Sequence, residues 1–393
     1  MDKNISIHNE KIKDLEIRFG DDEIKDILGN IQQCLKTGRL YQSQNVEAFE
    51  NLFAKYHGVK YGVAVSSGCA AIEIPMRILD IRNKEVIIPV NTFIATALGV
   101  VNAGGKVKLA DTAKGKLTPG LKEIQKQVTD KTVGVILVHI GGMIQEDIEE
   151  IRKWCCLKGF FLFEDASHAH GSRYGDKYAG GFGVAAGFSL FATKIITCGE
   201  GGIILTNDKK IAERAKRIRN YGKSSDWITE NNELGGNYRM SEITAAIALS
   251  QTNKLDEIVR KRKKLAELYN RLISSWREEL GVKTIYNEQI SGWYKMIVVL
   301  PLNVEIEQVQ QFLEQRGIKL PGKVYQYPLH KQPIAKQLKL EGYYPNAEDI
   351  CKRHIALPIY PSLEESNVYK IVDCLKQSIL ESKKHGKNKI VRS

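Results

Sequence analysis

Residues 187–207 of the 393-residue chain read GFSLFATKIITCGEGGIILTN. The pattern predicts an apolar strand, a turn that carries Lys194, a glycine-rich turn and a second apolar strand. Lys194 has no charged residue within five positions on either side, because the first is Glu200. Apolar surroundings disfavour an ammonium ion, so they lower the pKa of the lysine and make its amine a nucleophile. The alternative is a lysine at a strand end whose ammonium group reaches solvent.

The sequence before this stretch alternates between predicted strands and helices. Such alternation is typical of an α/β fold with a mostly parallel central sheet flanked by helices. The predicted strands are YGVAV (61–65), EVIIP (85–89), KVKLAD (106–111), KTVGVILVHI (131–140) and FFLFED (160–165). We therefore expect ligands to bind at the carboxyl edge of this sheet, where the strands end.

The length and the helical pattern predict two domains. Residues 1–255 are expected to form the large domain, and residues 256–382 a smaller C-terminal α/β domain. The N-terminal segment is a candidate to pack on the small domain, and the almost entirely helical stretch Met240–Leu280 joins the two. Residues 383–393, which are rich in lysine, are expected to form a basic flexible tail.

Composition excludes several classes of protein. The net charge is +12, but the basic runs lack interleaved aromatic residues, so we expect no nucleic-acid partner. No apolar run is long enough for a signal or a membrane span, which predicts a cytoplasmic protein without a membrane partner. The seven cysteines form no CxxC pair, so neither a disulfide framework nor a metal site is expected.

Four features fall at predicted strand ends. Ser66–Ala70, between a strand and a helix, is either an anion-binding turn or only a tight turn. Phe93 can lie flat on an aromatic ligand or belong to the core. Asp165 ends a strand, with His168 three residues later, and its alternative role is to cap the following segment. His139 and His170 are expected to be structural.

These residues together specify one cofactor. A desolvated lysine, a carboxylate for a ring nitrogen, a planar residue and a phosphate-binding turn are what pyridoxal 5′-phosphate requires of a protein. The turn comes early, Asp165 follows a middle strand, and Lys194 lies about thirty residues later.

The chain resembles the DegT/DnrJ/EryC1/StrS sugar aminotransferases from about Gly38 to about Leu375. The matching segments, in family order, are SSGCAA, NTFIATALGVVNAGGKVKLAD, FEDASHAHGSRYG, FSLFATKIITCGEGGIILTND, GGNYRMSEITAAI, YPLHKQP and ALPIYPSL. The resemblance implies a fold-type I transferase, similar in architecture to aspartate aminotransferase.

The same resemblance implies roles around the cofactor ring. Lys194 would form the Schiff base and then move the proton, and Asp165 would pair with the ring nitrogen. His168 would contact the ring hydroxyl, and Phe93 would stack on the ring. A lysine at position 194 argues against the dehydratase branch of the family, which has histidine there.

The resemblance also implies how the phosphate is bound. Gly68, Cys69 and Ser189 would bind it, although the family usually has threonine where this chain has Cys69. Asn237 would reach the phosphate of the partner subunit, which implies a homodimer with composite sites; its alternative role is a helix cap. The resemblance names no residue for the donor's carboxylate, and Arg239 is a neighbour that can be purely structural.

The implied reaction is a ping-pong transfer of an amino group from L-glutamate to a nucleotide-linked ketosugar, for amino-sugar biosynthesis. A related alternative is amination of a non-nucleotide ketone, such as an aminocyclitol precursor or a free ketosugar. A remote alternative is a regulatory or nucleic-acid-binding protein without catalysis. The sequence does not identify the sugar, its nucleotide or the aminated carbon.

Overall fold

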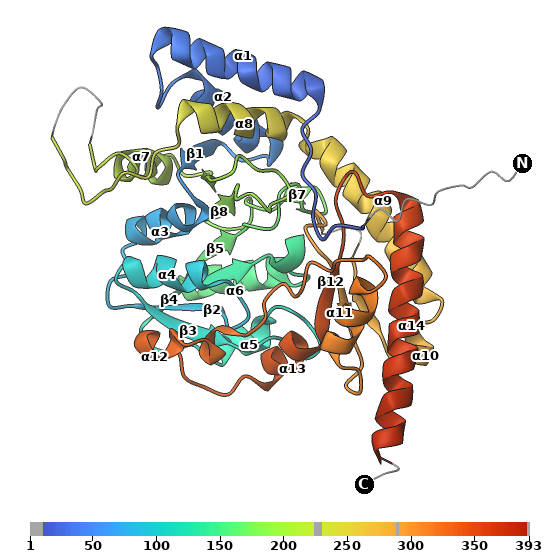
Figure 1. Ribbon diagram of the computed structural model, residues 1–393. Coiled ribbons are helices and arrows are strands. Elements are labelled where there is room, and N and C mark those ends of the chain that lie inside the picture. Colours follow the sequence, from blue (N-terminus) through green and yellow to red (C-terminus); the bar gives the residue numbers. More distant parts are fainter. Residues whose placement is uncertain (1–10, 224–229, 288–290, 391–393) are drawn as a thin grey trace, which may run out of the picture.

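The computed structural model describes residues 11–223, 230–287 and 291–390, with the backbone alone for residues 384–390. In this part of the chain, a seven-stranded sheet with the order β1-β9-β8-β5-β4-β2-β3 forms the centre (Figure 1). Its strands are β1 (Tyr61–Val65), β2 (Glu85–Pro89), β3 (Lys106–Ala110), β4 (Thr132–Val138), β5 (Phe161–Asp165), β8 (Ala185–Ser189) and β9 (Gly202–Thr206).

The central sheet is mostly parallel, as the alternating pattern predicted. Strands β3, β2, β4, β5 and β8 run parallel, whereas β9 is antiparallel to both β8 and β1. Gly202, the first residue of β9, consequently pairs with Ser189 at the end of β8 and with Val65 at the end of β1. The chain between residues 187 and 207 thus reverses its direction at the edge of the sheet where the parallel strands end.

Helices cover both faces of this sheet. Successive residues of a strand point to opposite faces, so neighbouring residues of β1 pack against different helices. Val63 and Val65 pack on the side of α3, α4 and α7, whereas Ala64 packs on the side of α2, α5, α6 and α8. Helix α1 packs on α8 at the outside. The helices are α1 (Asp21–Thr37), α2 (Gln44–Tyr56), α3 (Gly68–Ile78), α4 (Ile94–Asn102), α5 (Leu121–Gln125), α6 (Ile148–Lys158), α7 (Lys209–Ile218) and α8 (Glu242–Asn253).

A second core surrounds a small antiparallel sheet, which has the order β10-β11-β12 among the described residues. Helices α9, α11 and α14 contribute to this core, and Ile12 joins it by pairing with Ile318. The elements of this part are α9 (Leu255–Ser274), α10 (Arg277–Leu280), β10 (Lys283–Ile285), β11 (Met296–Val299), α11 (Ile306–Glu314), α12 (Ala335–Leu338), α13 (Pro345–Arg353), β12 (His354–Leu357) and α14 (Glu365–Ile390). A separate hairpin pairs β6 (Arg173–Tyr174) with β7 (Lys177–Tyr178). The domain boundary near residue 255 stays a prediction.

Two predicted segments differ in the structure. The helical stretch from Met240 to Leu280 is divided into α8, α9 and α10, with breaks at Lys254 and at Ser275–Trp276. Helix α14 continues to Ile390, past the start of the predicted flexible tail at residue 383, and the flexibility of this tail stays a prediction. The segment ESKKHGKNKI has no proline, and Lys383 donates to the carbonyl oxygen of Leu280 at 3.0 Å, so the helix is not forced to end earlier.

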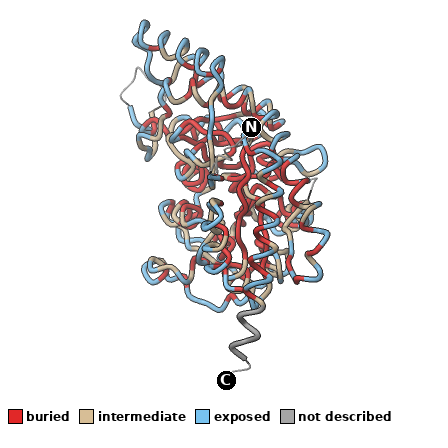
Figure 2. Tube along the Cα trace, turned by 45° about the vertical axis from the view of Figure 1, so that its right-hand side comes forward, coloured by how far each residue is buried: buried red, intermediate tan, exposed pale blue. Residues whose placement is uncertain are grey.

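Figure 2 shows that buried residues are concentrated in the middle of the molecule, between the layers of helices. Across the described ranges, no helix combines the length and apolar character needed to cross a lipid bilayer.

Candidate active site

A cavity of about 390 Å³ lies at the carboxyl ends of β1, β5 and β8. Every residue predicted for the site within one subunit lines this cavity. Its lining comprises Ser67, Gly68, Cys69, Ile72, Phe93, Ala95, Val138, Asp165, Ser167, His168, Ser189, Phe191, Thr193, Lys194, Glu200, Tyr294, Val324 and Tyr325. The structure therefore brings together predicted residues that lie up to 126 positions apart in the chain, from Gly68 to Lys194.

One end of the cavity is built from backbone. Ser67 is the N-cap of α3, and its hydroxyl oxygen accepts a hydrogen bond from the amide of Ala70 at 3.2 Å. Gly68 and Cys69 follow in the first turn, where helix amide groups lack partners within the helix and favour an anion. A Cβ atom on Gly68 would lie 2.7 Å from Cβ of Ser189, so only glycine allows β8 to approach this turn so closely.

Asp165 lies at the end of β5 and is 5% exposed. Its Oδ2 accepts a hydrogen bond from the hydroxyl of Thr96 at 2.6 Å, and its Oδ1 accepts one from the amide of Ser167 at 3.2 Å. The bond from Ser167 also agrees with the alternative prediction, in which Asp165 caps the following segment. The two bonds fix the carboxyl group of Asp165 in the cavity, where it can pair with a ring nitrogen.

Lys194 follows β8 in a turn, where its amide donates to the carbonyl oxygen of Phe191 at 2.9 Å. Burial lowers the pKa of Lys194 to about 8, while the charge of Asp165 opposes this shift and that of Lys295 adds to it. Nζ lies 5.2 Å from the centre of the Tyr294 ring. At neutral pH, an appreciable share of the Lys194 side chains therefore carries a free amine.

His168 is 8% exposed, and its ring stacks on Tyr294 with a centroid distance of 4.3 Å. Burial, together with the charges of Lys194 and Lys295, lowers the pKa of His168 well below its ordinary value, so the ring is neutral. The amide of Gly141 donates to Nδ1 at 3.4 Å. The proton is therefore on Nε2, which can donate a hydrogen bond to an oxygen in the cavity.

Phe93 is the N-cap residue of α4 and lines the cavity, although it is 58% exposed. Its position at the rim, away from the apolar core, favours the predicted contact with a ligand ring over the alternative of a core residue.

His139 and His170 have the structural positions that were expected. Nε2 of His139 lies 3.0 Å from Oε2 of Glu164, and both side chains are completely buried. His170 is also completely buried, and its ring packs against Phe53 and Phe188.

Asn237 does not line the cavity of its own chain. It is exposed and pairs through its backbone with Asn220. The alternative role as a helix cap is wrong, because Ser241 is the N-cap of α8. Arg239 donates to the side chain of Asn220 at 2.7 Å and lies over Tyr41, so its contacts are structural.

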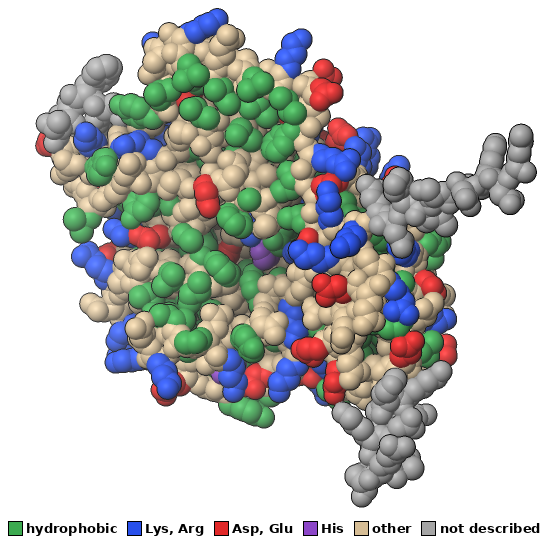
Figure 3. Space-filling view, viewed as in Figure 1, with side chains coloured by type: hydrophobic (Ala, Val, Ile, Leu, Met, Phe, Trp, Pro, Cys, Tyr) green, Lys and Arg blue, Asp and Glu red, His purple; other side chains and the backbone are tan. Residues whose placement is uncertain are grey.

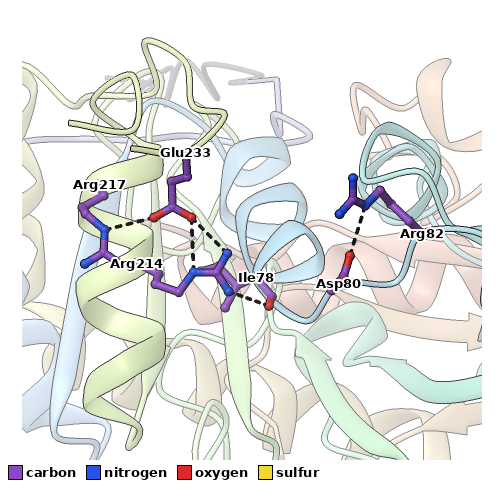
Figure 4. Close-up of polar contacts among 6 residues, drawn as sticks. All are labelled: Ile78, Asp80, Arg82, Arg214, Arg217 and Glu233. Atoms are coloured by element: carbon purple, nitrogen blue, oxygen red, sulfur yellow. Dashed lines mark hydrogen bonds and ion pairs between the residues drawn. The ribbon is translucent and has the colours of Figure 1, made fainter. Parts of the chain in front are cut away.

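The segment that leads to Asn237 is attached to α7 by one carboxylate. Glu233 accepts hydrogen bonds from Arg214 at 2.9 and 3.2 Å and from Arg217 at 3.0 Å (Figure 4). Arg214 also donates to the carbonyl oxygen of Ile78, at the end of α3. This double contact fixes the backbone four residues before Asn237.

Sequence reasoning missed several residues at the site. Thr96 is completely buried behind the cavity lining, where its hydroxyl donates to Asp165, and no local pattern predicted this contact. Tyr294 and Tyr325 come from segments near the small sheet, and no local pattern connects them with Lys194. Tertiary structure alone brings them to the site.

The residues present fit pyridoxal phosphate. The α3 turn and Ser189 can hold a phosphate, Asp165 a protonated ring nitrogen and Nε2 of His168 a ring hydroxyl. The lowered pKa of Lys194 also suits a cofactor whose aldehyde reacts with a free amine.

Comparisons with known proteins agree with this chemistry. Residues 21–376 match the DegT/DnrJ/EryC1/StrS aminotransferase family. The chain is 30% identical over 352 residues to GDP-perosamine synthase from Escherichia coli O157:H7, which covers 88% of this chain and 94% of that protein. It is 31% identical over 347 residues to dTDP-4-dehydro-2,3,6-trideoxy-D-glucose 4-aminotransferase from Saccharopolyspora spinosa, with 84% and 88% covered.

Solved structures give the same result. PseC from Helicobacter pylori, an aminotransferase involved in the biosynthesis of pseudoaminic acid, matches with a TM-score of 0.86 at 25% identity. The match covers 95% of this chain and 100% of that chain, so it includes both sheets. By sequence and by fold, the chain belongs to the DegT/DnrJ/EryC1/StrS aminotransferase family, whose aminotransferases use pyridoxal phosphate.

Proposed function

We propose that this aminotransferase moves an amino group from L-glutamate to the keto group of a nucleotide-linked sugar, by a ping-pong mechanism, for amino-sugar biosynthesis. The observation that carries the proposal is the buried amine of Lys194, with its pKa of about 8, in one cavity with the carboxylate of Asp165. The relatives named above, a GDP-perosamine synthase and an aminotransferase of a dTDP-linked sugar, support the nucleotide-linked substrate.

Lys194, Asp165 and His168 would each have a separate role in this reaction. When bound, pyridoxal phosphate supplies an aldehyde carbon that receives the amino group and a ring that withdraws electrons. Lys194 would hold this carbon before the donor binds, and its freed amine would then move the proton at Nζ. Asp165, fixed by Thr96, would pair with the protonated ring nitrogen. His168 would donate from Nε2 to the ring oxygen.

The remaining predicted residues bind and orient. The amides of Gly68 and Cys69 and the hydroxyl of Ser189 would hold the phosphate, and Phe93 would stack on the ring. Because Cys69 stands where the family usually has threonine, its backbone amide would make the contact without a hydroxyl bond to the phosphate. Tyr294 and Tyr325 also line the cavity and would exclude water from the reacting atoms.

The proposal includes a cytoplasmic homodimer with composite sites, in which Asn237 binds the phosphate held by the partner subunit. Figure 3 shows hydrophobic side chains gathered on the face that carries α1, α3, α4 and α8. Exposed large hydrophobic residues include Leu28, Leu35, Leu40, Tyr41 and Ile243. A monomer rarely leaves such a face in water, so a second copy of the chain is the proposed occupant.

The test uses the purified protein loaded with pyridoxal phosphate. L-glutamate should convert the bound cofactor to its pyridoxamine form, with loss of the visible absorption band and release of 2-oxoglutarate. A panel of nucleotide-linked ketosugars should then restore the band. Free ketosugars and cyclic polyol ketones are the comparison set, because restoration by these alone would favour the non-nucleotide alternative. A protein that neither binds the cofactor nor consumes glutamate would contradict the proposal.

A further inference from the structure

Tyr294 lines the active-site cavity, although the proposed mechanism gives it only the exclusion of water. Its ring stacks on His168, with a centroid distance of 4.3 Å and an angle of 25° between the ring planes. Nζ of Lys194 lies over the same ring, 5.2 Å from its centre. The hydroxyl oxygen of Tyr294 is 3.4 Å from that of Thr193. One side chain therefore contacts both the reacting amine and the histidine of the site.

The backbone around Tyr294 joins two cores. Trp293 packs in the core around the small sheet, whereas Tyr294 packs in a core beside the large sheet. Trp293 has a φ of +60°, which is rare for a bulky residue. Arg262 donates to its carbonyl oxygen at 3.1 Å, and its amide donates to the hydroxyl oxygen of Ser291 at 2.8 Å. These bonds hold the unusual conformation that separates the two neighbouring side chains.

Gly142, which follows β4, lies where the segments of His168 and Tyr294 meet. Its φ is +90°, and a Cβ atom there would lie 2.8 Å from the carbonyl oxygen of His168 and 3.1 Å from the amide nitrogen of Tyr294. The carbonyl oxygen of Gly142 accepts hydrogen bonds from the hydroxyl of Ser172 at 2.6 Å and from the amide of Gly292 at 3.2 Å. The same amide donates to the hydroxyl oxygen of Ser172 at 2.9 Å. Backbone contacts therefore set the position of Tyr294 relative to His168.

Charged groups reach Lys194 from several elements. Asp165, at the end of β5, favours its ammonium form, whereas Lys295, directly before β11, favours the free amine. Glu200 and the thiol of Cys69 line the same cavity. A second cavity of about 290 Å³ also borders on Lys194, and its other charged residues are Arg262 and the ion pairs Glu16–Arg18, Glu23–Lys254 and Glu257–Lys261. Tyr294 differs from these groups: burial raises its pKa, so it stays neutral over the pH range in which Lys194 titrates.

The face of an aromatic ring attracts a cation, and the attraction is stronger when both groups are removed from water. In the proposed mechanism, Lys194 carries a proton at Nζ for part of the reaction. We infer that Tyr294 is a positioning residue, whose ring face stabilises the ammonium form of Lys194 and whose stacking fixes the plane of His168. The inference rests on the proposed function and adds to it the residue through which the amine and the histidine keep their relative orientation.

The first experiment changes the electrons of the ring at position 294 while it preserves the shape of the ring. Full-length proteins with phenylalanine or trifluorophenylalanine at this position are loaded with pyridoxamine phosphate, which has no aldehyde and leaves the amine of Lys194 free. The rate of acetylation of Lys194 by acetic anhydride is then measured by mass spectrometry from about pH 6 to about pH 10.

Fluorine draws electrons from the ring face, so less of Lys194 should be protonated in the trifluorophenylalanine variant. At neutral pH, this variant should be acetylated about 2- to 5-fold faster than Tyr294→Phe, and the inflection of its profile should lie at lower pH. Tyr344 is the matched control, because it is also 8% exposed and its ring lies 4.8 Å from His330, but it does not line the cavity. The same two substitutions at Tyr344 should leave the profile of Lys194 unchanged. Equal profiles for the two variants at position 294 would overturn the inference.

The second experiment removes the ring. Tyr294→Leu frees His168 and Lys194 to change their orientation, so the maximal rate of loss of the visible band with glutamate should fall by about 10- to 100-fold. The glutamate concentration that gives half this rate should change by less than about threefold, because binding is not the step affected. Ser172→Ala keeps the ring but loosens the backbone junction, so it should give a smaller fall. Tyr344→Leu should match the wild type.

Equal losses in Tyr294→Leu and Tyr344→Leu would overturn the positioning role, because they would reflect general destabilisation. A wild-type maximal rate in Tyr294→Leu would overturn it as well. If the wild type ignores glutamate, the proposed donor is wrong, and the acetylation profiles still decide the role of Tyr294. Failure of the proposed function and failure of this inference therefore give different results.

Discussion

The hydroxyl of Thr96 donates a 2.6 Å hydrogen bond to Oδ2 of Asp165, and neither side chain is more than 5% exposed. Thr96 also lies 2.9 Å from the hydroxyl of Thr92, oxygen to oxygen, in the same buried group. The bond fixes the carboxylate that is proposed to pair with the ring nitrogen of the cofactor.

Thr96→Val should therefore impair catalysis while preserving the fold. A hydrogen bond to a charged group is worth about 1.5–3 kcal/mol, so we expect kcat to fall by about 10-fold or more. Thr96→Ser, which keeps the hydroxyl, should restore kcat. An unchanged kcat in Thr96→Val would show that the bond is only structural.

The pKa of Lys194 predicts how the apoprotein takes up its cofactor. Below a pKa of about 8, each pH unit leaves about tenfold less free amine, so the rate constant for appearance of the visible band should fall accordingly. Above this pH the rate constant should level off. Because Lys295 contributes to the low pKa, Lys295→Met should move the inflection to higher pH. An inflection near 10.5, the ordinary value for lysine, would contradict the burial argument.

Gly68→Ala should weaken cofactor binding. Its new Cβ would lie 2.7 Å from Cβ of Ser189, so the turn and β8 must separate. We expect the dissociation constant of pyridoxal phosphate to rise by at least about tenfold, with a loss of about 1–3 kcal/mol in the free energy of unfolding. Gly29→Ala is the control, since a Cβ there meets nothing within 4 Å and α1 should gain about 0.5–1 kcal/mol. Equal cofactor affinity in both variants would refute the close-approach argument.

The carboxylate of Glu233 should contribute measurably to stability. Glu233→Ala removes contacts to Arg214 and Arg217, so we expect the free energy of unfolding to fall by about 1 kcal/mol. Arg82→Ala is a matched control, because the Asp80–Arg82 pair in the same view is highly exposed (Figure 4). It should change the free energy by less than about 0.5 kcal/mol. Chemical denaturation of both variants measures the difference, and equal values would show that the double contact is weak.

Subunit mixing tests the role of Asn237. Lys194→Ala and Asn237→Ala should each have little activity alone, because general acid–base groups contribute about 10²- to 10⁴-fold and a phosphate contact is lost in the second variant. In a mixed dimer, one site would combine an intact Lys194 with an intact Asn237 from the other chain. Activity should therefore recover after the two are unfolded and refolded together, but not after each is refolded alone. No recovery would place Asn237 outside the partner's site.

The sequence predicted the parts of the site that follow strand ends. Asp165, Ser189 and the turn at Gly68 could be found because period-two strands and small-residue turns are local patterns. The same local patterns could not find Tyr294 or Tyr325, which reach the cavity from segments near the small sheet. The charge composition after residue 383 likewise did not predict that α14 continues to Ile390, because charge alone does not end a helix.

The cavity wall formed by Tyr294 and Tyr325 has an evolutionary consequence. Neither residue belongs to the central sheet, and neither bonds to Asp165 in the described structure. Both rings nevertheless stack on His168, at centroid distances of 4.3 and 6.1 Å. A lineage that drifts toward a new acceptor through these two positions therefore also changes the packing of a residue proposed to contact the cofactor.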